Sequence, residues 1–175
     1  MKRRWLLGLA LCAPIAFYGC GWEPLYADPE TGPASEELRA IQVDPILERI
    51  GQRLEIALRN SFNPSGEPTP ARYKLRTTLA TYLSNLGIQS QGLATLGKLD
   101  VFATYYLIDL QTGNNLLVNT LHVVNTFDLN PNQYSTIVGN DDAAVRSVAE
   151  LDREITTRLT LFFQRRLAAQ PPKPS

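Results

Sequence analysis

Residues 100–127, DVFATYYLIDLQTGNNLLVNTLHVVNTF, hold two long runs rich in aromatic, aliphatic and β-branched residues, separated by the polar segment QTGNN. Such runs are typical of strands, and Gly and Asn tolerate the positive φ angles of hairpin loops. The stretch therefore predicts a β-hairpin with strands over 100–110 and 116–127. Both strands are apolar at both sets of alternating positions, whereas a sheet with one face in water usually alternates more cleanly.

Two further strands are expected upstream of this hairpin. Residues 73–83 alternate between apolar and polar side chains, which predicts a strand with one more apolar face. Residues 84–98 contain enough Gly and polar residues to turn the chain, although part of this segment can extend the strand ladder. Residues 37–43, ELRAIQV, are a candidate for a short first strand.

Two helices are expected from apolar residues at helical spacing. The first begins at Asp44-Pro45, an N-cap followed by Pro at the first helical position, and ends near Ser61. The second runs from about Ala143 to Leu167 after a capping cluster at Asn140–Asp142. Its buried stripe is expected to comprise Ala144, Val148, Leu151, Ile155, Leu159 and Phe162.

The expected order is β-α-β-β-β-α, an α+β fold with two helices on one face of a mostly antiparallel, mixed four-stranded sheet. Two helices cover only one face, so the second set of alternating apolar residues is either covered by loops or a helix, or left exposed. If it is exposed, this second set forms a sizeable apolar patch, and such patches mark sites for a partner or a lipid. The residues concerned are Phe102, Tyr106, Ile108, Val118 and Val124.

The N-terminus has the layout of a secretory signal, with Lys2, Arg3 and Arg4 before an apolar run of roughly 14 residues. This run is shorter than the ~20 residues of a permanent transmembrane helix. A small residue, Gly19, directly precedes Cys20, as in the lipobox of bacterial lipoproteins, although Phe17 and Tyr18 depart from the usual Leu and small residue. Cys20 is therefore the predicted lipidation site. A disulfide between Cys20 and Cys12 is the alternative, and signal cleavage would remove it.

These features divide the chain into four parts. Residues 1–19 are the signal peptide, 20–35 the lipidated Cys and a tether, 36–168 a single domain, and 169–175 a disordered tail. Gly21, in place of the Asp that retains many such lipoproteins at the inner membrane, indicates the outer membrane by resemblance to enterobacterial sorting.

Composition and motifs favour a binding protein over an enzyme. Removing the three basic signal residues leaves 14 basic against 17 acidic residues, and no basic excess indicates nucleic acid. His122 is the single histidine and is expected to be an ordinary sheet residue, and Asp141-Asp142 is expected to cap a helix. Gly87, Gly92 and Gly97 form no phosphate loop. We expect no catalytic residues, no metal site and no cofactor.

Several pieces of the chain resemble the LPS-assembly lipoprotein family LptE, in the form common in alphaproteobacteria. They cover nearly all of the chain after the signal, and the likeness lies in layout more than in a strict signature. The pieces are CGWEPLY (20–26), ILERIGQRLEIALRNSF (46–62), ATYYLIDLQTGNNLL (103–117) and YSTIVGNDDAAVRSVAELDREITTRLTLFF (134–163).

The resemblance implies an outer-membrane lipoprotein on the periplasmic side that plugs the β-barrel partner LptD, one to one, and helps it assemble. Together the two would move lipopolysaccharide to the cell surface. Enclosure by a barrel would explain a sheet that is apolar on both faces. The acidic groups of lipopolysaccharide call for basic side chains, and the candidates are Arg72, Lys74, Arg76 and Lys98. Alternation puts Arg72, Lys74 and Arg76 on one face of their strand, and the plainer reading of these three residues is a solvated strand face.

Two other functions stay open at this point. An auxiliary lipoprotein of an envelope phospholipid-transport system could share a tethered α+β domain, and its partners would be an inner-membrane transporter and shuttle proteins. An envelope hydrolase is the third class, and a pocket that holds His122 with an acid would favour it.

Overall fold

The computed structural model describes residues 32–169 apart from 67, 69, 89–93 and 130. The predicted signal peptide, Cys20, most of the predicted tether and the predicted tail from residue 170 onward lie outside the described residues.

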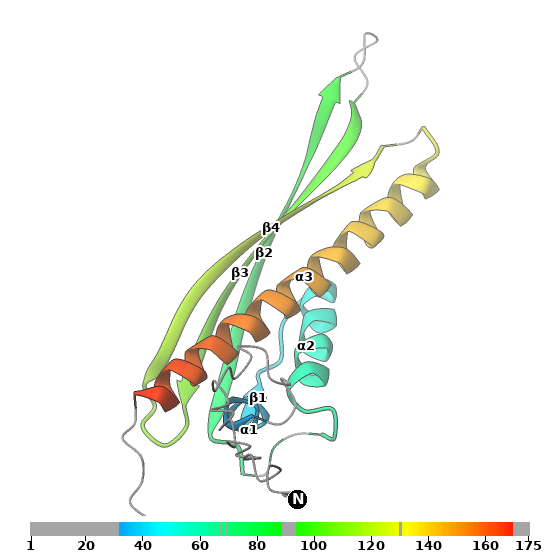
Figure 1. The fold of residues 1–175 in the computed structure, drawn as a ribbon. Helices are drawn as coiled ribbons and strands as arrows, with labels where there is room; N and C mark the ends of the chain where they lie inside the picture. The colour runs from blue at the N-terminus through cyan, green and yellow to red at the C-terminus, as the bar shows by residue number, and fades with distance from the viewer. Residues whose placement is uncertain (1–31, 67, 69, 89–93, 130, 170–175) are drawn as a thin grey trace, which may run out of the picture.

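The described residues form an α+β fold with a four-stranded mixed sheet, as predicted. The strand order is β1-β2-β3-β4, with β1 parallel to β2 and the other neighbours antiparallel. Figure 1 shows α3 running along the sheet, with α2 and α1 beside it. The elements are α1 (Pro33–Arg39), β1 (Ile41–Val43), α2 (Arg49–Phe62), β2 (Tyr73–Ile88), β3 (Ala94–Asp109), β4 (Asn115–Asp128) and α3 (Gln133–Ala168).

The core lies between α3 and the odd-numbered side chains of the central strand β3. Alternation along a strand sends every second side chain to the same face, and on β3 the buried set is Leu99, Val101, Ala103, Tyr105 and Leu107. The buried stripe of α3 includes the predicted Val148, Leu151, Ile155 and Leu159. At its two ends, however, Ala143 and Phe163 are buried in place of Ala144 and Phe162, which are only partly buried.

The chain begins its fold earlier than the sequence pattern indicated. α1 starts at Pro33, so the last residues of the segment predicted as a tether are helical, and Ala34, Ser35 and Leu38 are buried. The predicted strand 37–43 is correspondingly wrong in its first half, because residues up to Arg39 belong to α1 and only Ile41–Val43 pair with β2.

The predicted start of the first long helix at Asp44-Pro45 is wrong, since α2 begins at Arg49. Asp44 instead continues the strand direction, and its N–H donates to the Leu75 carbonyl over 2.9 Å. The Ile46 N–H donates to the carboxylate of Glu55 over 3.0 Å. The chain enters α2 through Glu48, which has a positive φ of 67°. These two bonds hold residues 44–48 away from the helical path.

The predicted start of the last helix at Ala143 is also wrong, because α3 begins at Gln133. Asn132 is the N-cap, and its side-chain oxygen accepts a hydrogen bond from the Tyr134 N–H over 3.0 Å. Asp141 and Asp142 therefore lie within the helix rather than at its start. Asp142 accepts a hydrogen bond from Arg146 one turn later.

The β2–β3 hairpin is longer than predicted, since the two strands stay paired out to Ile88 and Ala94. Figure 1 shows this hairpin projecting beyond the start of α3. A close aromatic contact lies near its far end. The Phe127 ring on β4 packs onto Gly97, its cross-strand partner, and a Cβ on Gly97 would lie 2.8 Å from Phe127 Cε1 and Cε2 and closer still to Cζ.

We therefore expect Gly97→Ala to destabilise the domain by about 1–3 kcal/mol, because the Phe127 ring must move to admit the methyl group. Urea unfolding followed by circular dichroism measures the change. In a Phe127→Ala background the same substitution should cost much less, since the ring is gone. An equal cost in both backgrounds would show that the ring contact is not the cause.

Candidate functional site

The face of the sheet opposite the helices carries every residue predicted to contact a barrel. Phe102, Tyr106 and Ile108 occupy even-numbered positions on β3, and Val118 and Val124 occupy even-numbered positions on β4. The helix-covered core uses the odd-numbered set of the same strands. Val118 is 51% exposed and Val124 is 46% exposed. Phe102, Tyr106 and Ile108 are half-buried, so among the described residues the outer face is partly open to solvent and most exposed along β4.

The strand register arranges the outer face in short cross-strand rows. Tyr106 lies between Arg76 on β2 and Val118 on β4. The next row is polar, and its Thr104 and Thr120 hydroxyls lie 3.0 Å apart. Phe102 then lies opposite His122. Aromatic rings, aliphatic side chains and hydrogen-bonding groups thus share this face, which suits contact with a protein surface of mixed chemistry.

An aromatic cluster forms the middle of this face. The rings of Phe102 and His122 stack in parallel, with centroids 4.1 Å apart and an interplanar angle of 2°. The Tyr82 ring meets Phe102 edge to face, at 5.9 Å and 79°. Aromatic pairs of this kind contribute about 0.5–1.5 kcal/mol beyond their buried area. The three rings therefore form an aromatic platform on the outer face.

Asp100 joins this cluster to Lys98. The His122 Nε2 lies 2.8 Å from one Asp100 carboxylate oxygen, and the Lys98 Nζ lies 2.9 Å from the other. The hydrogen bond from Lys98, followed by the one from His122, lowers the pKa of Asp100 below its usual value. His122 is held by stacking and by a carboxylate on an open face, and it lines neither of the clefts described below.

The four cations predicted to contact lipopolysaccharide each lie within 3.4 Å of a carboxylate. Lys74 and Arg76 share one face of β2, as the alternation predicted, and both approach Asp44, at 3.3 and 3.4 Å. Arg72 precedes the strand, and its guanidinium lies 3.1 Å from Glu37 on α1 and 5.7 Å from the Tyr73 ring centre. Arg72 therefore pairs with a carboxylate on α1, whereas Lys74 and Arg76 both pair with Asp44.

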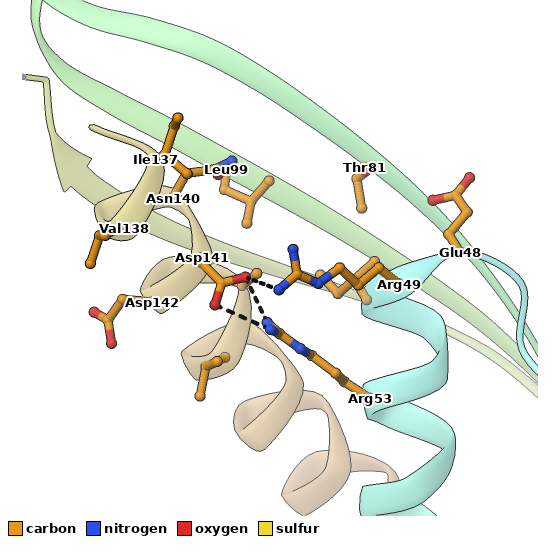
Figure 2. A pocket seen from close by; sticks show the side chains of 13 residues that line it. Glu48, Arg49, Arg53, Thr81, Leu99, Ile137, Val138, Asn140, Asp141 and Asp142 are labelled. Carbon is orange, nitrogen blue, oxygen red and sulfur yellow. Dashed lines mark hydrogen bonds and ion pairs between the residues drawn. The ribbon is translucent and has the colours of Figure 1, made fainter. Parts of the chain in front are cut away.

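A cleft of about 650 Å³, which the sequence pattern did not indicate, lies on the helix side of the sheet. Figure 2 shows its floor, formed by side chains such as Leu99 and Thr81, and its walls on α2 and α3. Ile137 and Val138 give one wall an apolar surface, and both are exposed.

Two arginines and one aspartate lie at the side of this cleft. The Asp141 carboxylate binds Arg53 at 3.0 Å and Arg49 at 3.4 Å, and the hydrogen bond from Arg53 lowers the pKa of Asp141. The i,i+4 spacing of the two arginines was visible in the sequence. Their common partner on another helix was not.

Two general properties of the described residues bear on function. They contain no group of three or more His, Cys, Asp or Glu side chains placed to hold a metal ion. Among the described helices, none combines the length and the apolar character needed to cross a lipid bilayer.

Comparison with known proteins gives a likeness of fold. Neither a known protein family nor a curated protein matches the sequence. A Caulobacter crescentus CB15 crystal structure assigned as a lipoprotein has a TM-score of 0.61 at 20% identity, covering 82% of this chain and 100% of that chain. The uncharacterized lipoprotein B of Nitrosomonas europaea has a TM-score of 0.55 at 11% identity, covering 71% and 82% of the two chains. The chain therefore shares its fold with bacterial lipoproteins.

The Asp100 network gives a titration that can be measured by NMR of the carboxyl carbons. Because Lys98 and His122 favour the ionised carboxylate, the stability that Asp100 contributes is present above its unfolded pKa and is lost as the pH falls through the lower folded pKa. We expect Lys98→Gln to raise the pKa of Asp100 and His122→Gln to raise it less. Lys74→Gln, which removes a partner of Asp44 instead, should leave it unchanged, and an equal shift there would refute the local cause.

Proposed function

We propose that this chain is an outer-membrane lipoprotein, anchored through Cys20, whose open sheet face packs inside a β-barrel partner of the LptD type that exports lipopolysaccharide. The observation that carries the proposal is the outer face itself. It presents Phe102, Tyr106 and Val118 on the side of the sheet that no described helix covers. The shared fold with bacterial lipoproteins supports it, as does the lipobox-like sequence around Cys20.

A barrel lumen matches this face in chemistry. Along each strand of a membrane barrel, polar side chains that face the lumen alternate with apolar side chains that face the lipid. The outer face offers polar groups to such a lumen through the Thr104–Thr120 row and the Lys98–Asp100–His122 network. The side chains of that row and of that network are partnered with one another, which lowers the cost of burying them against a wall.

Lys74 and Arg76 are the strongest candidates for contact with the acidic groups of lipopolysaccharide. They share one carboxylate, Asp44, so the three side chains carry one surplus positive charge. The Arg76–Asp44 contact is exposed, and exposed ion pairs contribute only about 0–1 kcal/mol, so a phosphate can compete with Asp44 for Arg76. Lys98 is less available, because its partner Asp100 is buried and also binds His122.

The proposal assigns a binding role and no catalytic one. His122 and Asp100 lie within hydrogen-bonding distance, but on the outer face of the sheet rather than in either cleft. No described feature favours the phospholipid-transport alternative over the barrel partner, and the pull-down below separates the two.

Lipidation is tested by Cys20→Ser. We expect this variant to lose incorporation of labelled palmitate and to move from the membrane fraction to the soluble periplasmic fraction, because acyl chains supply the membrane affinity. Membrane association that persists without the label would show that Cys20 is not the anchor.

The partner is tested by a mild-detergent pull-down of the tagged native chain from outer membranes, with Val118→Glu as the variant. We expect one large barrel at about one to one with the wild type, and at least about tenfold less with Val118→Glu, because an unpaired charge would be buried at the interface. Ile56→Glu is the matched control, since Ile56 is similarly exposed but lies on α2. Capture of inner-membrane transporter subunits instead would replace the barrel proposal with phospholipid transport.

A further inference from the structure

The edge of β2 is unpaired over most of its length within the described residues. β1 pairs with β2 only from Tyr73 to Leu75, and the N–H of Asp44 donates to the Leu75 carbonyl at the end of that pairing. β2 then continues to Ile88 with β3 on its other side. Because Leu75 directs its carbonyl to the β1 side, every second residue after it does the same. The residues whose backbone N–H and C=O groups point to the free edge are Thr77, Leu79, Thr81, Leu83 and Asn85.

The opposite edge of the sheet is partly capped, whereas the β2 edge lacks the usual protection. On β4, the Asn119 side chain accepts a hydrogen bond from the Thr120 N–H over 2.8 Å, and Arg146 donates to the Thr126 carbonyl over 2.9 Å. Natural edge strands are commonly blocked by charged residues or proline. Residues 77–88, TTLATYLSNLGI, contain neither. This edge is therefore open to pairing with another strand.

Apolar side chains flank the free edge on both faces of the sheet. Tyr82 is 61% exposed on the outer face, and Leu83 is 59% exposed on the helix side. Leu86, further along, is 39% exposed. An added strand would bury apolar area above and below the sheet while it supplies backbone partners, which is how extended segments bind to sheet edges.

Two hollows lie beside the same edge and can receive side chains of an added strand. The 650 Å³ cleft reaches β2 at Thr81, and a second hollow of about 470 Å³ lies between Arg76–Leu79 of β2 and the segment from Asp44 to Glu48. Glu48 lines both hollows, so they are neighbours along the edge. Figure 2 shows Thr81 and Glu48 together at this side of the larger cleft.

We propose that the free edge of β2, from Leu79 to Asn85, pairs with an extended, uncharged and largely apolar segment of the barrel partner. The source of the segment rests on the proposed function. Because residues 77–88 carry no charge, a charged side chain of the added strand would find no counterpart on β2 itself. Tyr82 connects the edge to Phe102 on the outer face, so one partner contacts both surfaces. A second copy of this chain at the edge would leave the outer face open.

The first test removes one backbone donor. The Thr81 N–H faces the free edge, so Thr81→Pro deletes a donor for the added strand and leaves the β2–β3 ladder intact. Thr81→Val is the matched control, because it keeps the N–H. We expect at least about tenfold less barrel in the pull-down with Thr81→Pro and an unchanged amount with Thr81→Val. Circular dichroism and thermal melting check that both variants fold.

A second variant keeps the proposal open to refutation if Thr81→Pro fails to fold. Leu83→Lys places a charge beside the free edge, as natural edge strands do, and its side chain starts from an exposed position. It should also lose the barrel. If the folded variants keep the barrel, strand addition is refuted while the proposed function stands. If the wild type itself captures no barrel, the strand-addition proposal and the proposed function are both refuted.

Amide hydrogen exchange at single-residue resolution supplies the direct readout. In the free chain, the Tyr82 amide should exchange slowly, because it pairs with β3, while the Thr81 and Leu83 amides should exchange quickly. In the purified complex, all three should be slow. Fast exchange at Thr81 and Leu83 in the complex would overturn the proposal. Protection of these two amides in the concentrated isolated chain would assign the edge to a second copy instead.

Discussion

The packing of α3 against one face of the long hairpin is the contact on which the rest of the structure depends. Val101, Tyr105 and Leu107 of β3 are fully buried against a helix layer whose main member is the 36-residue α3. Burial of large apolar side chains contributes roughly 1.5–3 kcal/mol each. Because all the described helices belong to this layer, the same contact that forms the core leaves the other face of the sheet without a cover.

The two faces and two edges of the sheet consequently differ in chemistry and in exposure. The outer face carries an aromatic platform tied to a charged network through Asp100, and the edge of β4 is partly capped by Asn119 and Arg146. The edge of β2 is uncharged and open beyond Leu75. A domain that exposes apolar side chains on one sheet face beside an open strand edge would be prone to aggregate in isolation. Under the proposed function, the barrel partner would cover both of these surfaces.

Much of the fold was predictable from local pattern, and the misplaced boundaries have specific causes. The hairpin around QTGNN, the α+β class and most of the α3 stripe follow from alternation and helical spacing. The starts of α2 and α3 do not. Asp44-Pro45 and Asn140–Asp142 both match capping chemistry. In the structure, however, the Asp44 N–H donates to the Leu75 carbonyl of β2, and the Asp141 carboxylate accepts from Arg53 from within α3. The polar character of residues 133–142 indicated a loop, although Asn132 caps a helix there.

The sequence by itself determined which side chains share a face, because the period of a β-strand is two and leaves no choice once a strand is identified. Alternation alone therefore groups Phe102, Tyr106 and Val118 on one side of the sheet. Only the tertiary structure decided which face the helices cover, which carboxylate each cation meets, and which edge stays open. These depend on strand order and register, and contacts such as Asp100–His122 or Arg53–Asp141 join residues whose separation in sequence carries no signal of their distance in space.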